Sequence, residues 1–306
     1  MLIIEKTLDF QLNESTAVVL GKFDGVHLGH RFLLAKLREQ QAKGLKTVVF
    51  TFDKSPACLS SENVDDLKEL CTLEEKRAIC ASNGVDIYIE FPMNKETAQI
   101  SAEAFIEEYL CKRLNCKCLI AGDDLQFGYK GMGNAQTLLQ HPFAKECQVD
   151  IYEKLPGISS TIIREFVAKG DIAKANECLG YPYEVTGTVV HGMGLAGTSL
   201  QMPTANIVFP DGKVLPKFGV YFTRVKVDGT YYNAITNVGR KPTVVDSLDV
   251  YAETYLYDFA GDLYGKEMTV YFEHFWRREE KFSGLEALKA QLHKDMKSGK
   301  AYWFSK

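Results

Sequence analysis

Short apolar runs alternate with segments of helical periodicity through the first 180 residues. The run 18–20 leads through a glycine-rich turn into a helix predicted to begin near Leu28, with leucines at 33, 34 and 37 on one face. Gly44 ends this helix. Further strands are predicted at 46–52, 85–91, 117–121 and 148–152, with helices between them at 72–84, 101–114 and 133–140. This alternation predicts a parallel, doubly wound sheet that binds ligands at the carboxyl ends of its strands.

The second half of the chain has a different period. Runs rich in Tyr, Val, Thr and Phe follow one another with few helix-length segments between them, at 183–191, 219–227, 231–238, 249–259 and 267–276. Asp228-Gly229 is a hairpin signal between two of these runs. The pattern predicts an antiparallel sheet closed into a small barrel, followed by an amphipathic helix at 285–296.

Composition also changes near residue 180, where Tyr181-Pro182 follows a short predicted helix. All eight cysteines lie between Cys58 and Cys178, whereas both tryptophans and 11 of the 15 tyrosines lie from Tyr181 onward. We therefore predict two domains: an α/β domain with a Rossmann-like parallel sheet at 1–181, and an antiparallel β-barrel with a terminal helix at 182–306.

The overall charge and hydropathy limit the classes of partner. A net charge of −4 and a pI near 5.9 argue against a nucleic-acid partner. No apolar run approaches the ~20 residues that span a bilayer, and the N-terminus lacks the features of a secretory signal. The cysteines show no C-x-x-C pair, which favours buried thiols in a reducing compartment. We expect a cytoplasmic protein without membrane partners, monomeric or weakly oligomeric, that acts on small molecules.

Several common nucleotide and hydrolase motifs are missing from the sequence. It has no P-loop, no H-E-x-x-H and no G-x-S-x-G. One G-x-G-x-x-G is formed by Gly192, Gly194 and Gly197, but Pro203 and the strand-rich surroundings exclude the helix that a dinucleotide fingerprint must open. We interpret it as a flap whose backbone N–H groups can close over phosphates, with a plain loop as the alternative.

The start of the first long helix is a candidate phosphate site. His27 and His30 lie where free N–H groups and the positive end of the helix dipole gather. Spacing alone does not decide the roles of three further residues. Lys22 could contact ligand or simply be exposed, and Asp24 could contact ligand or cap the turn. Asp124 could contact ligand or be a solvated loop residue. A second cluster of donors caps a later helix and comprises Ser159, Ser160, Thr161 and Arg164.

These residues resemble the motifs of a known enzyme family. Residues 21–30 resemble the G-x-F-D-G-V-H-x-G-H signature of the nucleotidyltransferases that make FAD, and this match includes Gly21, Phe23, Asp24 and Gly25. Residues 158–164 resemble their I-S-S-T-x-I-R motif, and residues 122–128 their G-x-D-F-x-F-G segment. Downstream, 203–206 is similar to the P-T-A-N motif of riboflavin kinases, 237–243 to their N-I-G-x-x-P-T turn, and 253–266 to the region of their catalytic glutamate. Order and coverage resemble the bacterial bifunctional riboflavin kinase/FMN adenylyltransferases.

The resemblance implies two active sites, both of which use ATP. In the N-terminal domain, ATP would lie along the turn at 21–30, with His27 and His30 on its phosphates. Residues 159–164 would close on the leaving pyrophosphate, and FMN would become FAD. The other residues expected to bind ATP or its phosphates are Gly21, Phe23, Asp24, Gly25 and Asp124. In the kinase domain, Glu253 would accept the proton of the riboflavin 5′-hydroxyl. Thr204 and Asn206 would lie near Mg²⁺, and Pro203, Asn237 and the 192–197 flap would bind ATP and flavin.

The sequence departs from the family pattern mostly in the kinase half. An arginine and a glycine expected before P-T-A-N are replaced within 198–202, which includes Thr198, Gln201 and Met202. Tyr255 occupies a position where the family often has a histidine, and Arg278 one where it often has an acidic residue. In the N-terminal half, Ile162 replaces a frequent arginine, and residues 53–56 depart from the usual D-P-H-P. Loss of a charged phosphate contact weakens catalysis. A monofunctional adenylyltransferase with a degenerate kinase domain, a non-catalytic flavin-binding regulator and a nucleic-acid-binding barrel are therefore the alternatives.

Overall fold

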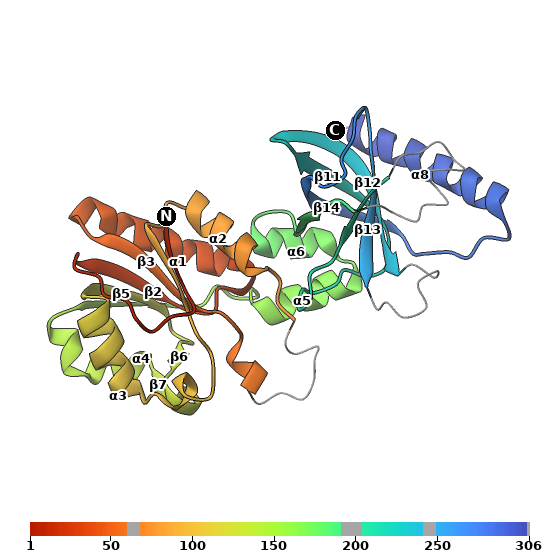
Figure 1. The fold of residues 1–306 in the computed structure, drawn as a ribbon. Helices are drawn as coiled ribbons and strands as arrows, with labels where there is room; N and C mark the ends of the chain where they lie inside the picture. The colour runs from red at the N-terminus through yellow and green to blue at the C-terminus, as the bar shows by residue number, and fades with distance from the viewer. Residues whose placement is uncertain (60–67, 191–203, 241–248, 305–306) are drawn as a thin grey trace. The chain divides into compact units, whose positions relative to one another are not determined.

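A computed structural model describes residues 1–59, 68–190, 204–240 and 249–304 (Figure 1). The chain divides into two compact units, Met1–Ser160 and Thr161–Lys306, each with its own six-stranded sheet. The predicted flap at 192–197 and the departures at 198–202 lie outside the described residues, as does Pro203.

The sheet of the first unit is parallel throughout, with strand order β1-β4-β3-β2-β5-β8. The predicted doubly wound sheet is therefore confirmed. It has one strand more than the pattern predicted, the N-terminal strand β1, which lies at one edge of the sheet. The strands are β1 (Leu2–Glu5), β2 (Thr16–Leu20), β3 (Lys46–Phe52), β4 (Ile87–Phe91), β5 (Cys116–Gly122) and β8 (Gln148–Tyr152).

Helices cover both faces of this sheet, which is why its inner strands read as continuous apolar runs. Val19 faces the core that contains residues of α1 (Leu28–Glu39) and α2 (Leu73–Ser82). Val18 faces the opposite core, which contains Leu138 of α4 (Ala135–Gln140). The carboxyl ends of β2, β5 and β8 are neighbours in the sheet, so the turns that follow these strands share one edge.

The helix expected at 101–114 has a different geometry. Ala102–Ala104 is α-helical, but Phe105–Arg113 is a π-helix that ends with a bond from the Leu114 N–H to the Tyr109 carbonyl, 2.9 Å long. The buried positions of this segment are 105, 106, 109, 110 and 114, which face the core on the opposite side of the sheet from α1. The hydrophobic pattern alone did not separate the two helix types.

The sheet of the second unit is antiparallel, with strand order β10-β13-β12-β11-β14-β9. An isolated bridge between Val190 and Asn206 brings its two edges together, with a 2.8 Å bond from the Val190 N–H to the Asn206 carbonyl. This confirms the predicted barrel. Its strands are β9 (Glu184–Thr188), β10 (Ala205–Val208), β11 (Gly219–Val227), β12 (Thr230–Arg240), β13 (Val250–Leu256) and β14 (Glu267–Arg277).

Two short helices precede this barrel, α5 (Ser160–Lys169) and α6 (Ile172–Leu179). Asn176 of α6 donates to the Phe272 carbonyl on β14 at 2.8 Å and accepts from the Tyr183 N–H at 2.7 Å. These bonds attach α6 to the barrel.

The terminal helix α8 (Leu285–Phe304) is longer than predicted and buries other residues. Leu285, expected on its apolar face, is 53% exposed. Asp295 is buried instead, and its carboxylate accepts from Arg277 Nη2 at 2.6 Å and from Trp276 Nε1 at 3.2 Å. The helix is thus attached to β14 by a buried ion pair in addition to apolar packing.

Asp295→Ala should destabilise the second unit by about 3–5 kcal/mol, because it leaves the Arg277 guanidinium without its buried partner. Both tryptophans, Trp276 and Trp303, lie in this unit, so denaturant unfolding followed by tryptophan fluorescence reports on it. Lys266→Ala removes an exposed ion pair with Asp228 and should leave the midpoint nearly unchanged. Equal effects of the two substitutions would contradict the assignment.

Candidate active sites

The turn that connects β2 to α1 has a strained backbone. Phe23 (φ 49°) and Val26 (φ 33°) lie in the left-handed region, which costs about 1–3 kcal/mol for each such residue. Burial of Phe23 offsets this cost: its ring is fully buried, with its centroid 4.9 Å from that of His30. Gly21 leaves room for the ring, because a Cβ there would lie 3.1 Å from it. The glycine and phenylalanine of the motif therefore have structural roles.

His27 and His30 meet at the N-terminus of α1, as predicted. Their rings stack with centroids 3.8 Å apart. His27 caps the helix, since its Nδ1 accepts from the His30 backbone N–H at 3.4 Å. The His27 proton therefore lies on Nε2, which can donate to a ligand. His30 Nδ1 is buried and makes no hydrogen bond within the described residues.

Both imidazoles are neutral at physiological pH. Burial lowers the pKa of His27 from 6.5 to about 4, against the nearby charge of Asp24. Burial and the adjacent His27 hold the pKa of His30 well below its usual range. The pair can therefore offer N–H donors to a phosphate without carrying positive charge.

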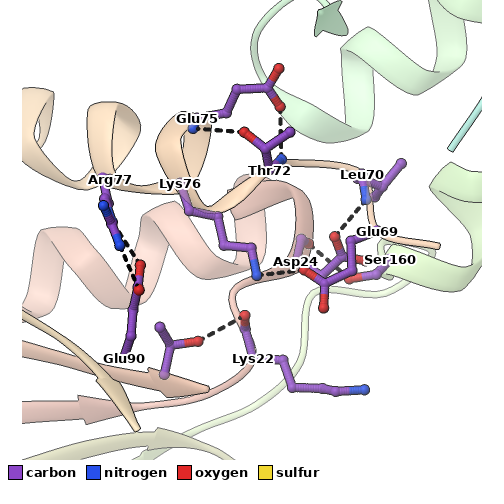
Figure 2. A network of polar contacts seen from close by, with 11 residues as sticks. Lys22, Asp24, Glu69, Leu70, Thr72, Glu75, Lys76, Arg77, Glu90 and Ser160 are labelled. Atoms are coloured by element: carbon purple, nitrogen blue, oxygen red, sulfur yellow. Dashed lines mark hydrogen bonds and ion pairs between the residues drawn. The ribbon is translucent and has the colours of Figure 1, made fainter. Parts of the chain in front are cut away.

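Asp24 stabilises the turn from inside (Figure 2). It is buried, and its Oδ1 accepts from the Leu70 backbone N–H at 2.7 Å. The Asp24 backbone carbonyl accepts from the Ser160 hydroxyl at 2.9 Å, so Ser160 contacts the turn that connects β2 to α1. The Lys22 carbonyl accepts from Thr51 Oγ1 at 3.0 Å. The Asp24 carboxylate therefore ties the turn to the segment that precedes α2.

Ser159 precedes α5 and Ser160 is its first residue, as the hydroxyl-rich sequence predicts. Thr161 and Arg164 lie on the same helix, in the second compact unit, with Thr161 exposed and Arg164 half-buried. Ile162, the departure from the family pattern, is 36% exposed, whereas Ile163 is buried.

Two lysines near the histidines were missed from the sequence. Lys76 of α2 is buried, and its ammonium contacts Glu69 Oε2 at 2.6 Å (Figure 2). Lys154, two residues after β8, pairs with Asp124 Oδ2 at 2.9 Å. The charges of both lysines lower the pKa of His30. Their only sequence signal is position: Lys154 follows a predicted strand, and Lys76 lies on a predicted helix.

The second site lies on one row of the barrel sheet. Glu253 on β13 is opposite Asn206 on β10 and opposite Asn237 on β12. Glu253 Oε1 accepts from the Thr204 hydroxyl at 2.8 Å. The neighbours of Glu253 along the strand, Ala252 and Thr254, are buried on the other face. The register therefore brings together four residues that are up to 49 apart in sequence.

Oxygen atoms dominate this row, which suits a hard cation. Asn206 is buried, and its Oδ1 makes no hydrogen bond within the described residues. With the Thr204 hydroxyl it offers the kind of ligand that Mg²⁺ accepts alongside phosphate oxygens and water. Over the described ranges, His, Cys, Asp and Glu do not form a group of three or more that could hold a metal alone. The donors fit an ion that arrives with phosphates.

Glu279, also missed from the sequence, lies at the end of this row. Its Oε1 accepts from Asn237 Nδ2 at 3.4 Å, and its side chain lies against Gly239. Of the two described departures, Tyr255 packs edge-on against Tyr257 with centroids 5.5 Å apart, and Arg278 is exposed. The acidic residue next to Arg278 thus provides a carboxylate close to the row.

Comparisons with known proteins find a separate family match for each of two parts of the chain. A family described as FAD synthetase matches residues 9–165, and one described as riboflavin kinase matches residues 179–303. The fold and the family matches define a class of proteins in which a nucleotide-binding α/β domain precedes a riboflavin kinase barrel. The chain belongs to the family of bifunctional riboflavin kinase/FMN adenylyltransferases.

Curated relatives support this membership over nearly the whole chain. The bifunctional riboflavin kinase/FMN adenylyltransferase of Listeria monocytogenes is 35% identical, covering 97% of this chain and 95% of that protein. That of Escherichia coli K12 is 34% identical, over 92% and 91%. A solved Streptococcus pneumoniae structure, named a macrolide-efflux protein, is 29% identical with a TM-score of 0.87, covering 98% of this chain and 99% of that one. In the part of our chain that the structure describes, every helix is too short or too polar to cross a bilayer.

The pKa of His27 can be tested by NMR titration of the imidazole resonances, which should show a midpoint near pH 4 for His27. His27→Asn assigns the resonance while keeping a side chain that can cap α1. A midpoint near 6.5 would show that the ring is not desolvated as described.

Proposed function

We propose that this chain phosphorylates riboflavin to FMN in its barrel and transfers the adenylyl group of ATP to FMN in its α/β domain, giving FAD. Family membership over both halves carries this proposal. The two separate clusters, one at the N-terminus of α1 and one on the β10-β13-β12 row, supply a site for each reaction.

In the adenylyl transfer, a phosphate oxygen of FMN attacks the α-phosphorus of ATP and the bond to pyrophosphate breaks. His27 and His30 donate hydrogen bonds to the phosphates, together with the free N–H groups at the start of α1. The stacked rings supply directed hydrogen-bond donors. Ser159, Ser160, Thr161 and Arg164 bind the departing pyrophosphate, and Gly21, Phe23, Asp24 and Gly25 fix the turn. Asp124 lies at the same strand edge.

In the kinase reaction, the 5′-hydroxyl of riboflavin attacks the γ-phosphorus of ATP, the bond from that phosphorus to ADP breaks, and Glu253 accepts the hydroxyl proton. The hydrogen bond from Thr204 orients the Glu253 carboxylate, and a base in this position contributes roughly 10²–10⁴-fold. Thr204 and Asn206 would hold Mg²⁺, which would neutralise phosphate charge when bound. Asn237, Pro203 and the glycines Gly192, Gly194 and Gly197 bind nucleotide or flavin.

We propose a functional boundary after Tyr181, with the transferase domain at 1–181 and the kinase domain at 182–306. The two family matches leave residues 166–178 between them, close to this boundary, whereas the compact units divide earlier in the chain, after Ser160. A cytoplasmic location is supported by eight free cysteines, including Cys116 and Cys147, whose sulfur atoms lie 3.7 Å apart in a thiol hydrogen bond and do not form a disulfide. We propose a monomer or weak oligomer.

Two reciprocal substitutions test the assignment of one reaction to each site. Glu253→Gln should lower FMN formation from riboflavin by roughly 10²–10⁴-fold while FAD formation from supplied FMN continues. His30→Ala should do the reverse. Chromatography of the flavins after incubation with ATP and Mg²⁺ measures both activities in one sample. Loss of both activities in both variants would contradict separate sites.

The same assay tests the second candidate, a monofunctional adenylyltransferase. The replacements at Tyr255 and Arg278 favour it, because they remove side chains that are frequent in the family. If the unmodified chain converts FMN to FAD but makes no FMN from riboflavin, this second candidate is correct.

A further inference from the structure

A lysine that lies outside every recognised motif is positioned beside the His27–His30 pair. Lys154 follows β8, the strand next to β5, and β5 lies next to β2, which leads into the histidine turn. The Lys154 backbone N–H donates to Asp123 Oδ1 at 3.2 Å, and the Asp123 N–H donates to the Tyr152 carbonyl at 2.9 Å. These bonds tie the Lys154 backbone to the turn after β5.

The ammonium group of Lys154 is held on the same turn. Its Nζ lies 2.9 Å from Asp124 Oδ2, and a Cβ at Gly122 would lie 3.0 Å from Asp124 Oδ1. The neighbouring strands β2, β5 and β8 end at one edge of the sheet, which places Lys154 at the same edge as the histidine turn. In agreement with this placement, the Lys154 charge lowers the pKa of both His27 and His30.

Two lysines act on His30, and they differ in what they can bind. The Lys76 side chain is 2% exposed and is bonded to Glu69, so an incoming phosphate cannot reach it without displacing protein. The Lys154 side chain is 49% exposed and its partner Asp124 is 63% exposed. An exposed ion pair of this kind contributes little to stability and exchanges partners readily.

The histidine pair supplies hydrogen-bond donors, and the charge of the phosphates is left to other groups. ATP brings several negative charges, and the two imidazoles offer hydrogen bonds but no positive charge at neutral pH. We propose that Lys154 is the cation that binds the phosphates of ATP at the adenylyltransferase site, and that Asp124 holds its ammonium group in place until phosphate replaces the carboxylate. This inference rests on the proposed function of the N-terminal site.

Lys154→Met keeps most of the side-chain length and removes the charge. It should lower kcat/KM for ATP in FAD formation by about 10–100-fold, the loss expected for a charge-assisted phosphate contact. Lys154→Arg should restore activity to within about 5-fold, because it keeps the charge. Steady-state kinetics with FMN in excess separates KM for ATP from kcat. Riboflavin phosphorylation by the same samples should be unchanged.

Asp124→Asn tests whether Asp124 acts by holding the Lys154 ammonium group or by contacting the ligand itself. If Asp124 acts through Lys154, the double variant should lose no more activity than Lys154→Met alone, whereas multiplied losses would overturn the holding role. Lys112→Met is the matched control, since this lysine also pairs with a carboxylate, Glu108, and lies on the π-helix.

The outcomes separate this inference from the proposed function. Wild-type kcat/KM in Lys154→Met, or equal losses in the Met and Arg variants, would overturn the role of Lys154 while FAD formation by the unmodified chain stands. An unmodified chain that makes no FAD from FMN and ATP would overturn the proposed function itself.

Discussion

The left-handed backbone at Phe23 and Val26 is the constraint on which the N-terminal site depends. It places the Phe23 ring under His30, and this in turn brings the two imidazoles into a stack with 3.8 Å between centroids. The same turn lets His27 cap α1, which fixes its tautomer. Because the rings are desolvated and adjacent, their neutral form is favoured, and positive charge at this site comes from other groups. Strain, burial and phosphate binding are thus parts of one arrangement.

The two units assemble phosphate-binding groups in different ways. The parallel sheet gathers turns at one edge, so that its donors come from a helix start and from the ends of separate strands. The antiparallel barrel instead lines up side chains across neighbouring strands, from Asn206 through Glu253 to Asn237. The first arrangement uses backbone N–H groups and histidines, and the second uses carboxylate, amide and hydroxyl oxygens. This difference fits transfer of an adenylyl group in one unit and deprotonation of an alcohol in the other.

Sequence patterns predicted the strands that carry a strong burial signal. β3, β8 and β11 have the predicted bounds. β1 was missed because it is a short edge strand with an exposed Leu2, and β10 because its four residues follow Pro203. The motifs identified His27, His30, Thr204, Asn206 and Glu253, which the fold brings into two clusters. Lys154 and Glu279 could not be predicted, because proximity across strands has no local signal.

Strand register gives the kinase site a further property. Side chains alternate between the two faces of a strand, so a shift of β13 by one residue would turn Glu253 toward the barrel interior and bring Thr254 outward. Asn206 and Asn237 would then face an alcohol in place of a carboxylate. Kinase competence is therefore a sensitive readout of correct barrel assembly: molecules that misfold by register alone would keep their secondary structure and flavin adenylylation, yet be unable to phosphorylate riboflavin.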